Sequence, residues 1–143
     1  MILYVDTSCL LKCYIAEPHC GEAREWVAAA DAVATSRVTY PEMAAAFGQR
    51  QRRGDVSAAL VHRSLRHLSH RWTELLLVDI TEIRAAGLAL RHALRGFDAV
   101  QLAAALALRA AVGGGDIAFA SFDERLNRAA RSEGLIVLEP SRP

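Results

Sequence analysis

Short apolar runs alternate with longer helix-length segments along the whole 143-residue chain, and this alternation limits the folds that it can adopt. Five runs are typical of buried strands, at residues 2–5, 32–35, 75–78, 117–120 and 135–138. The segments between them predict helices at residues 8–16, 41–54, 55–72, 81–94, 97–112 and 124–133. A further helix is expected after residue 21 and includes residues 26 and 30. Strands that alternate with helices favour a mainly parallel sheet covered on both faces. We therefore expect an α/β fold, a three-layer α/β/α domain with about five strands.

One domain accounts for residues 1–143, because the chain contains no linker, repeat or low-complexity segment and its hydrophobic content of 52% suffices for a core. The first residues lack the charged region and long apolar stretch of a signal peptide. The apolar helix at 97–112 is shorter than the roughly 20 residues that a bilayer requires, so we expect no membrane association. Three cysteines, an odd number, predict no disulfide framework and favour the cytoplasm.

Four acidic residues lie at the ends of the expected elements. Asp6 directly follows the first strand, Asp123 follows the fourth, and Glu42 and Asp98 lie in the first turns of two helices. In open parallel sheets, ligands bind beyond the carboxyl ends of the strands, so the four carboxylates are candidates for one pocket. Each of them could instead cap a helix or interact with its dipole.

Asp98 is the residue that capping explains least well. The ten residues after it contain Gln101 as their only polar side chain, so we expect a buried helix. A carboxylate at the start of such a helix needs a partner, either an arginine or a metal ion, because an unpaired buried charge is strongly destabilising.

Four segments carry a family resemblance, and they occur in the family's order: Leu-Tyr-Val-Asp-Thr-Ser at 3–8, Tyr-Pro-Glu at 40–42, Gly-Phe-Asp-Ala-Val-Gln-Leu-Ala at 96–103 and Phe-Ala-Ser-Phe-Asp-Glu-Arg-Leu at 119–126. The chain resembles PIN-domain ribonucleases, specifically the VapC-type toxins of bacterial type II toxin–antitoxin pairs. The resemblance covers essentially the whole chain. It implies that an acidic quartet holds catalytic Mg²⁺ or Mn²⁺ and that Ser121 supplies a supporting hydroxyl; the quartet is Asp6, Glu42, Asp98 and Asp123.

The resemblance further implies an RNA substrate cut to 5′-phosphate and 3′-hydroxyl ends, a cognate antitoxin and a homodimer. Carboxylates suit Mg²⁺ and Mn²⁺, which prefer oxygen ligands, can activate a bound water and can neutralise charge on phosphate. The stretch at 113–116 is longer than usual in the family and makes Asp116 a rival for the fourth position. We keep Asp123, because Asp116 precedes the fourth strand and should lie at the opposite edge of the sheet.

The net charge of +1 conceals a segregation of charge. Residues 48–71 contain six arginines and one acid, a net charge of +5, so the rest of the chain carries −4. We predict phosphate contacts from this segment at Arg50, Arg52 and Arg53, and from the first helix at Lys12. The pattern of polar and apolar residues in the first helix predicts that Lys12 is exposed. The arginines could also be a solvated face, and the basic face at 62–71 could instead meet the antitoxin.

Two other functions fit parts of the pattern. A metal-dependent phosphatase or phosphotransfer domain would use Asp6 as a nucleophile, but many such enzymes carry a second acid two residues later, where this chain has Ser8. A catalytically inert PIN-like binding module would have no need for all four acids. Endoribonuclease activity remains the favoured interpretation.

Overall fold

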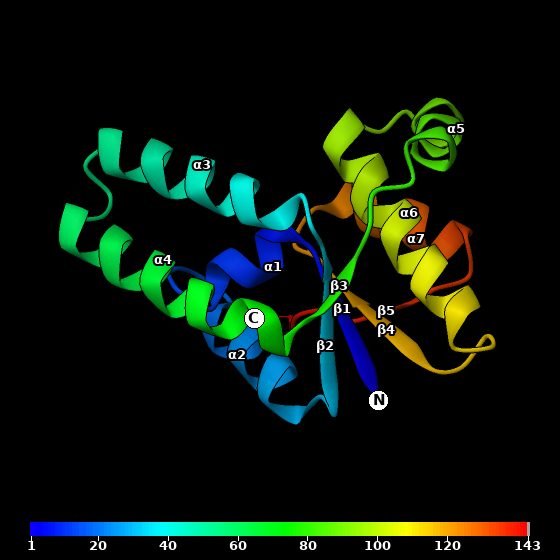
Figure 1. Ribbon diagram of the computed structural model, residues 1–143, viewed down its shortest axis with the longest axis horizontal. Helices are drawn as coiled ribbons and strands as arrows, with labels where there is room; N and C mark the ends of the chain where they lie inside the picture. Colours follow the sequence, from blue (N-terminus) through cyan, green and yellow to red (C-terminus); the bar gives the residue numbers. More distant parts are fainter. Residues whose placement is uncertain (143) are drawn as a thin grey trace.

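A five-stranded sheet forms the centre of the computed structural model, which describes residues 1–142 (Figure 1). Every pair of neighbouring strands is parallel, and their order is β3-β2-β1-β4-β5. The strands are β1 (Ile2–Val5), β2 (Ala32–Ser36), β3 (Leu76–Val78), β4 (Ile117–Ala120) and β5 (Ile136–Val137). The predicted five-stranded sheet is confirmed, and it is parallel throughout.

Helices cover both faces of the sheet, which confirms the predicted three layers (Figure 1). One layer contains α1 (Thr7–Lys12), α2 (Cys20–Ala29), α3 (Thr39–Arg52) and α4 (Ala58–Arg71), which runs into the 3₁₀ turn η1 (Trp72–Glu74). The other contains α5 (Glu82–His92), α6 (Gly96–Ala111) and α7 (Glu124–Ser132). Successive side chains of a strand point to opposite faces of the sheet. Leu3 and Val5 therefore pack in the core beneath α1 to α4, and Tyr4 packs in the core beneath α5 to α7.

The pairing of β1 with β4 places the loops after these two strands side by side. Ile2 is paired with Ile117 and Val5 with Ala120. The Asp6 N–H continues the ladder by donating to the carbonyl oxygen of Ala120 at 3.1 Å. Asp6 and Ser121 therefore lie next to each other at the carboxyl edge of the sheet.

Helix boundaries differ from the sequence expectations where local hydrogen bonds intervene. Helix α1 ends at Lys12 rather than residue 16, because Cys13 and Tyr14 donate to carbonyls three residues back and so tighten the last turn. Helix α3 begins at Thr39, which places Pro41 inside the first turn, where a missing N–H loses no helical bond. Helix α4 begins at Ala58, because the Ser57 hydroxyl accepts from the Leu60 N–H.

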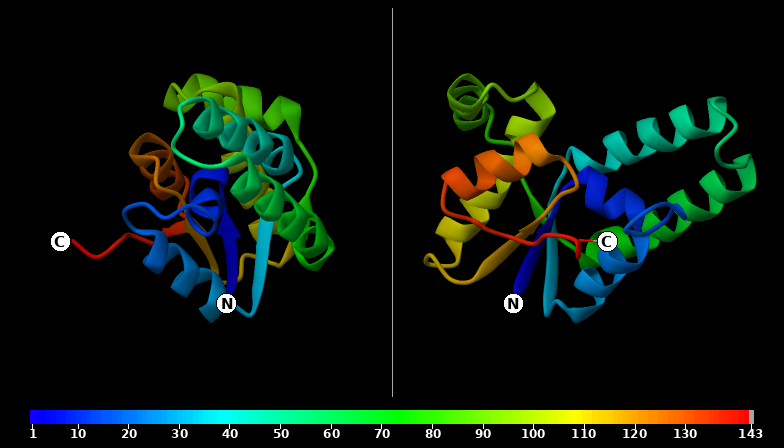
Figure 2. Two further views of the ribbon diagram at one scale, coloured as in Figure 1. Left: turned by 90° about the vertical axis from the view of Figure 1, so that its left-hand side faces the viewer. Right: turned by 180° about the vertical axis from the view of Figure 1, so that it is seen from behind.

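Helices α3 and α4 form an antiparallel pair that extends away from the sheet, which we call the α3–α4 arm (Figure 2). The two helices are joined at their outer ends by a turn in which Gly54 has a φ of +80°, a conformation that favours glycine. Glu42 lies in the first turn of α3, whereas Arg52 and Arg53 lie at the outer end of the arm. Within residues 1–142, no helix is both long and apolar enough to cross a membrane.

Candidate active site

Asp6 is the most buried of the four predicted acids, with 4% of its surface exposed. Its carboxylate caps α1 by accepting from the Cys9 N–H at 2.9 Å. It also accepts from the hydroxyls of Ser8 at 2.7 Å and Ser121 at 2.6 Å. Burial raises the pKa of Asp6 to about 6, and the charge of Asp98 adds to the rise, while the three hydrogen bonds oppose it.

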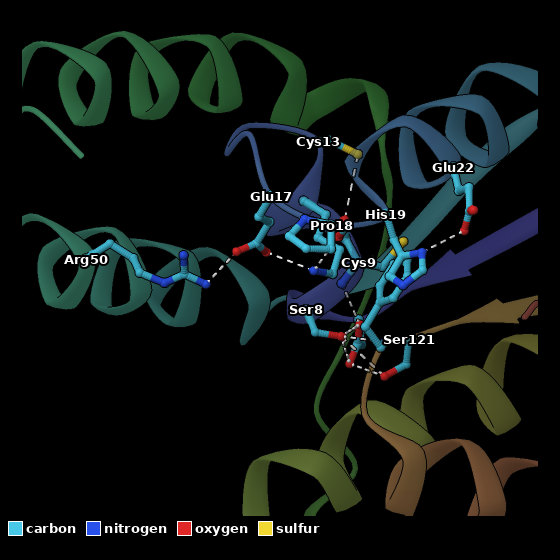
Figure 3. Close-up of polar contacts among 12 residues, drawn as sticks. Ser8, Cys9, Cys13, Glu17, Pro18, His19, Glu22, Arg50 and Ser121 are labelled. Atoms are coloured by element: carbon cyan, nitrogen blue, oxygen red, sulfur yellow. Dashed lines mark hydrogen bonds and ion pairs between the residues drawn. The ribbon is translucent and has the colours of Figure 1, made fainter. Parts of the chain in front are cut away.

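Ser121 connects the loops that follow β1 and β4. Its hydroxyl donates to Asp6, accepts from the Asp123 N–H at 3.0 Å and lies 3.3 Å from the Ser8 hydroxyl. Figure 3 shows Ser8, at the start of α1, and Ser121, in the loop after β4, converging on each other. The Ser8 hydroxyl in turn accepts from the Phe122 N–H at 2.8 Å. The structure thus places Ser121 as a hydroxyl that supports two of the predicted acids.

The other three acids come from the starts of three different helices. The Asp123 carboxylate caps α7 by accepting from the Leu126 N–H at 2.9 Å. Glu42 is in the first turn of α3, and its Oε1 accepts from the Thr7 hydroxyl at 2.8 Å. Asp98 is in the first turn of α6 and is half-buried. All four acids therefore lie beyond the carboxyl ends of the strands or on helices that begin there.

Capping accounts for two of these acids and leaves two unexplained. Asp6 and Asp123 are both helix caps, as the simpler interpretation predicted. Glu42 and Asp98 make no capping hydrogen bond, and the residues at the cap positions of their helices are Val38 and Arg95. The expectation of a buried helix after Asp98 is confirmed for Ala99 and for residues 101–106, whereas Asp98 itself is only half-buried.

The charges of the acids act on one another. Burial raises the pKa of Asp98, and the carboxylates of Asp123 and Glu42 raise it further, against the opposing influence of Arg95 and Arg125. Within residues 1–142, none of the four predicted acids forms an ion pair. The site therefore collects negative charge that no side chain of the described chain neutralises at close range.

The residues at this site suit a hard divalent cation. As placed, no three His, Cys, Asp or Glu side chains in the described part of the chain form a group that could hold a metal ion by themselves. Mg²⁺ usually takes one or two carboxylates and keeps several water ligands, so a ready-made cage of protein ligands is not required. The carboxylates are oxygen donors whose mutual repulsion a dication would relieve, and on this chemistry the donor set fits Mg²⁺ or Mn²⁺.

One acid, Glu17 in the loop between α1 and α2, holds both Lys12 and Arg50. Figure 3 shows Glu17 facing Arg50. The Lys12 ammonium lies 2.9 Å from Glu17 Oε1, and the Arg50 guanidinium lies 2.8 Å from Glu17 Oε2. Burial alone would raise the pKa of Glu17, but these two cations lower it overall. The Lys12 side chain is only 15% exposed and lies 4.9 Å from the centre of the Phe122 ring, so the expectation that it is exposed was wrong.

Arg52 and Arg53 are exposed at the outer end of the arm. An open groove of about 470 Å³ lies along α3, and its lining includes Glu42, Gln49 and Arg52. Glu42 and Arg52 therefore place opposite charges along one groove, and an anion that approaches Glu42 along α3 would meet Arg52.

Sequence reasoning missed the residues that hold the predicted ones in place. Gln101 donates to Glu42 Oε1 at 3.0 Å, and Thr7, Ser8 and Glu17 act as described above. The signal for Gln101 was present, because it is the one polar residue among ten after Asp98. No comparable signal in the sequence marks Glu17. Its contacts with Lys12 and Arg50 depend on the course of the loop between α1 and α2.

Three comparisons place the chain among known proteins. A family model described as PIN domain matches residues 3–132. Ribonuclease VapC45 and Ribonuclease VapC49, from two strains of Mycobacterium tuberculosis, are each 34% identical over 136 residues, covering 93% of this chain and 92% of the relative. Ribonuclease VapC46 of Mycobacterium tuberculosis is 28% identical, with 97% and 98% covered.

Solved structures show the same fold at lower identity. PAE2754 from Pyrobaculum aerophilum superposes with a TM-score of 0.66 at 17% identity, over 96% of this chain and 83% of that one. FitAcB from Neisseria gonorrhoeae gives a TM-score of 0.64 at 16% identity, over 97% of both chains.

The parallel sheet, the acids at its carboxyl edge and the match over residues 3–132 together define a PIN domain. Within this family the chain belongs to the VapC group, which confirms the resemblance read from the sequence.

The raised pKa of Asp6 makes a prediction about the metal-free protein. Between pH 4 and about 6 the folded chain holds a proton on Asp6 that the unfolded chain has lost, so stability falls as the pH rises through this range. The loss is at most about 3 kcal/mol, the equivalent of a two-unit shift in pKa. Asp6→Asn should therefore be more stable than the wild type at pH 7, and the difference should shrink toward pH 4.

Urea denaturation in the presence of a chelator, at a series of pH values, measures this effect. Asp116→Asn is the matched control for loss of one carboxyl, because Asp116 is exposed before β4, at the end away from the site. If the wild type and Asp6→Asn show parallel pH profiles, the burial of an ionisable carboxyl at Asp6 does not determine stability.

Proposed function

We propose that this chain is a metal-dependent endoribonuclease, the toxin component of a toxin–antitoxin pair, and that Mg²⁺ or Mn²⁺ bound by its acids is required for cleavage. The observation that carries the proposal is the convergence of four carboxylates, none paired with a cation of the described residues, at the carboxyl edge of the sheet. Relatives named as ribonucleases over almost the whole chain support the same activity.

Each acid has a role that its surroundings suit. When bound, the ion lowers the pKa of a coordinated water and offsets the negative charge on the scissile phosphate. Asp98 and Glu42 are the ligands that the fold leaves most available, since neither is a helix cap. Asp6 and Asp123 are held by their caps and by Ser121, so they present fixed oxygens to the same site.

The environment of Asp6 argues against the phosphatase alternative. A nucleophilic carboxylate needs an oxygen that can reach the phosphorus atom of the substrate. Asp6 is almost fully buried, Oδ1 accepts from Cys9 and Ser8, and Oδ2 accepts from Ser8 and Ser121. These bonds favour a fixed ligand or electrostatic role over attack on phosphate.

The proposed RNA path runs along α3, from the acids to the outer end of the arm. Arg52 and Arg53 are exposed there and fit phosphate contacts. Lys12 and Arg50 remain predicted contributors, but Glu17 already neutralises part of their charge. The main electrostatic attraction along this path is therefore assigned to Arg52 and Arg53.

Replacing Asp98 tests the proposed chemistry. Asp98→Asn removes a charge from the metal site, and we expect RNA cleavage to fall by about two orders of magnitude or more while the fold and any antitoxin complex persist. The measurement is end-mapping of RNA cleaved by the purified protein in Mg²⁺, with a chelator arm that should abolish cleavage. Asp116→Asn, the rival fourth acid, should cleave like the wild type. Cleavage retained in Asp98→Asn would reject the site.

Charge reversal at the end of the arm tests the RNA path. Arg52→Glu with Arg53→Glu, made in the Asp98→Asn background so that RNA stays intact, should weaken RNA binding at low salt while leaving Mn²⁺ affinity nearly unchanged. Each lost phosphate contact should reduce the slope of log K against log salt by about 0.7. Arg63→Glu with Arg66→Glu on α4 is the control of equal charge. An unchanged slope would show that the arginines at this end are only solvated.

A homodimer is also proposed, supported by large apolar side chains exposed on α5 and at the start of α6. Ile83 is 85% exposed, Leu90 is 87% exposed and Phe97 is 61% exposed, and the first two are seven residues apart on one face of α5. Light scattering should give twice the chain mass of 15.5 kDa. Ile83→Glu with Leu90→Glu should shift it to the monomer, whereas Ile136→Glu, on β5, should not. A monomeric wild type would reject the dimer.

A further inference from the structure

Gln101 is a buried amide in the middle of an apolar helix. It is 2% exposed and is the only polar member of the buried residues of α6, which otherwise are alanines and leucines. Leaving a buried amide without partners costs a few kcal/mol. Its hydrogen bonds therefore indicate why the position is polar.

Four side chains surround the Gln101 amide. The Tyr4 hydroxyl donates to Oε1 at 2.6 Å. On the other side, Nε2 lies 3.1 Å from Thr7 Oγ1, 2.9 Å from Thr39 Oγ1 and 3.0 Å from Glu42 Oε1. The amide therefore contacts β1, α1 and α3 at once, and it does so from a position one turn after Asp98 on α6.

The neighbouring hydroxyls fix the orientation of this amide. Thr35 donates to the Val5 carbonyl oxygen at 2.7 Å, so the proton shared with Thr39 at 2.8 Å belongs to Thr39. Thr39 therefore offers only lone pairs to Gln101. A reversed amide would place its oxygen against the Glu42 carboxylate and against Thr39 Oγ1, with no donor for either.

The other end of the chain of hydrogen bonds gives the same orientation. The fully buried Tyr4 hydroxyl donates to Gln101 Oε1, so Nε2 faces the acids.

The consequence falls on Glu42. Both hydrogen bonds that this carboxylate accepts from described side chains, from Thr7 and from Gln101, are made to Oε1. Oε2 accepts no hydrogen bond from a described residue. With Thr7 alone, the carboxylate could rotate about its last bond, whereas a second donor from another helix fixes its plane.

Building on the metal-binding role proposed above, we propose that Gln101 is a positioning residue of the acidic site. It fixes the Glu42 carboxylate so that Oε2 is presented to the metal ion. Outer partners of metal ligands typically contribute 10- to 100-fold in metal affinity.

A double-mutant cycle with Mn²⁺ as the probe tests this role. Gln101→Met keeps the side-chain length and removes both polar atoms, and it should weaken Mn²⁺ binding by about tenfold in calorimetric titration of the metal-free protein. Glu42→Gln alone should also weaken binding. In the Glu42→Gln background, Gln101→Met should cause no further loss, because its effect passes through Glu42.

Two further variants separate positioning from general damage to the core. Leu102→Met, at the next position of α6 and also fully buried, controls for a methionine in this helix and should bind Mn²⁺ like the wild type. Tyr4→Phe keeps the Gln101 amide but removes the donor that orients it, so it should weaken binding by less than Gln101→Met, again only when Glu42 is present. It also serves if Gln101→Met does not fold.

The outcomes distinguish the two proposals. An equal loss of affinity in both backgrounds, or no loss in either, overturns the positioning role of Gln101. If Glu42→Gln itself binds Mn²⁺ like the wild type, the assignment of Glu42 to the metal site fails instead.

Discussion

The parallel pairing of β1 with β4 is the constraint on which the site depends. It places the first residue after each strand at the same edge, so the Asp6 N–H extends the ladder and Ser121 reaches the Asp6 carboxylate. Residues separated by 115 positions in the sequence thereby become direct partners. The helix starts that bring Glu42, Asp98 and Asp123 are then grouped around this pair.

The same grouping works against the stability of the metal-free chain. Asp6 and Asp98 both have raised pKa values because they are removed from water and lie near other carboxylates. The surrounding structure compensates with local hydrogen bonds, two helix caps and the Gln101 network, which organise the acids without neutralising them. Such an arrangement is expected where the charge itself is the functional property.

Much of the fold could be predicted from the sequence, because apolar runs and breaks identify the strands and their order of alternation with helices. The positions of Asp6 and Asp123 followed from the rule that ligands bind beyond strand ends. The exposure of Lys12 was predicted wrongly, because helical periodicity does not predict the path of the loop that brings Glu17 into contact with Lys12. Gln101 stood out as polar, but its partners lie on three elements far apart in the chain, so only the fold reveals its contacts.

The length of α3 sets a physical scale for the substrate. Glu42 and Arg52 are ten residues apart on this helix, a separation of about 15 Å, or roughly four stacked nucleotides at a rise of 3.4 Å. For the proposed RNA substrate, a fragment shorter than this cannot occupy the acids and the outer arginines together. The arm would therefore act as a molecular ruler, favouring loops or single strands long enough to bridge both ends over short oligonucleotides.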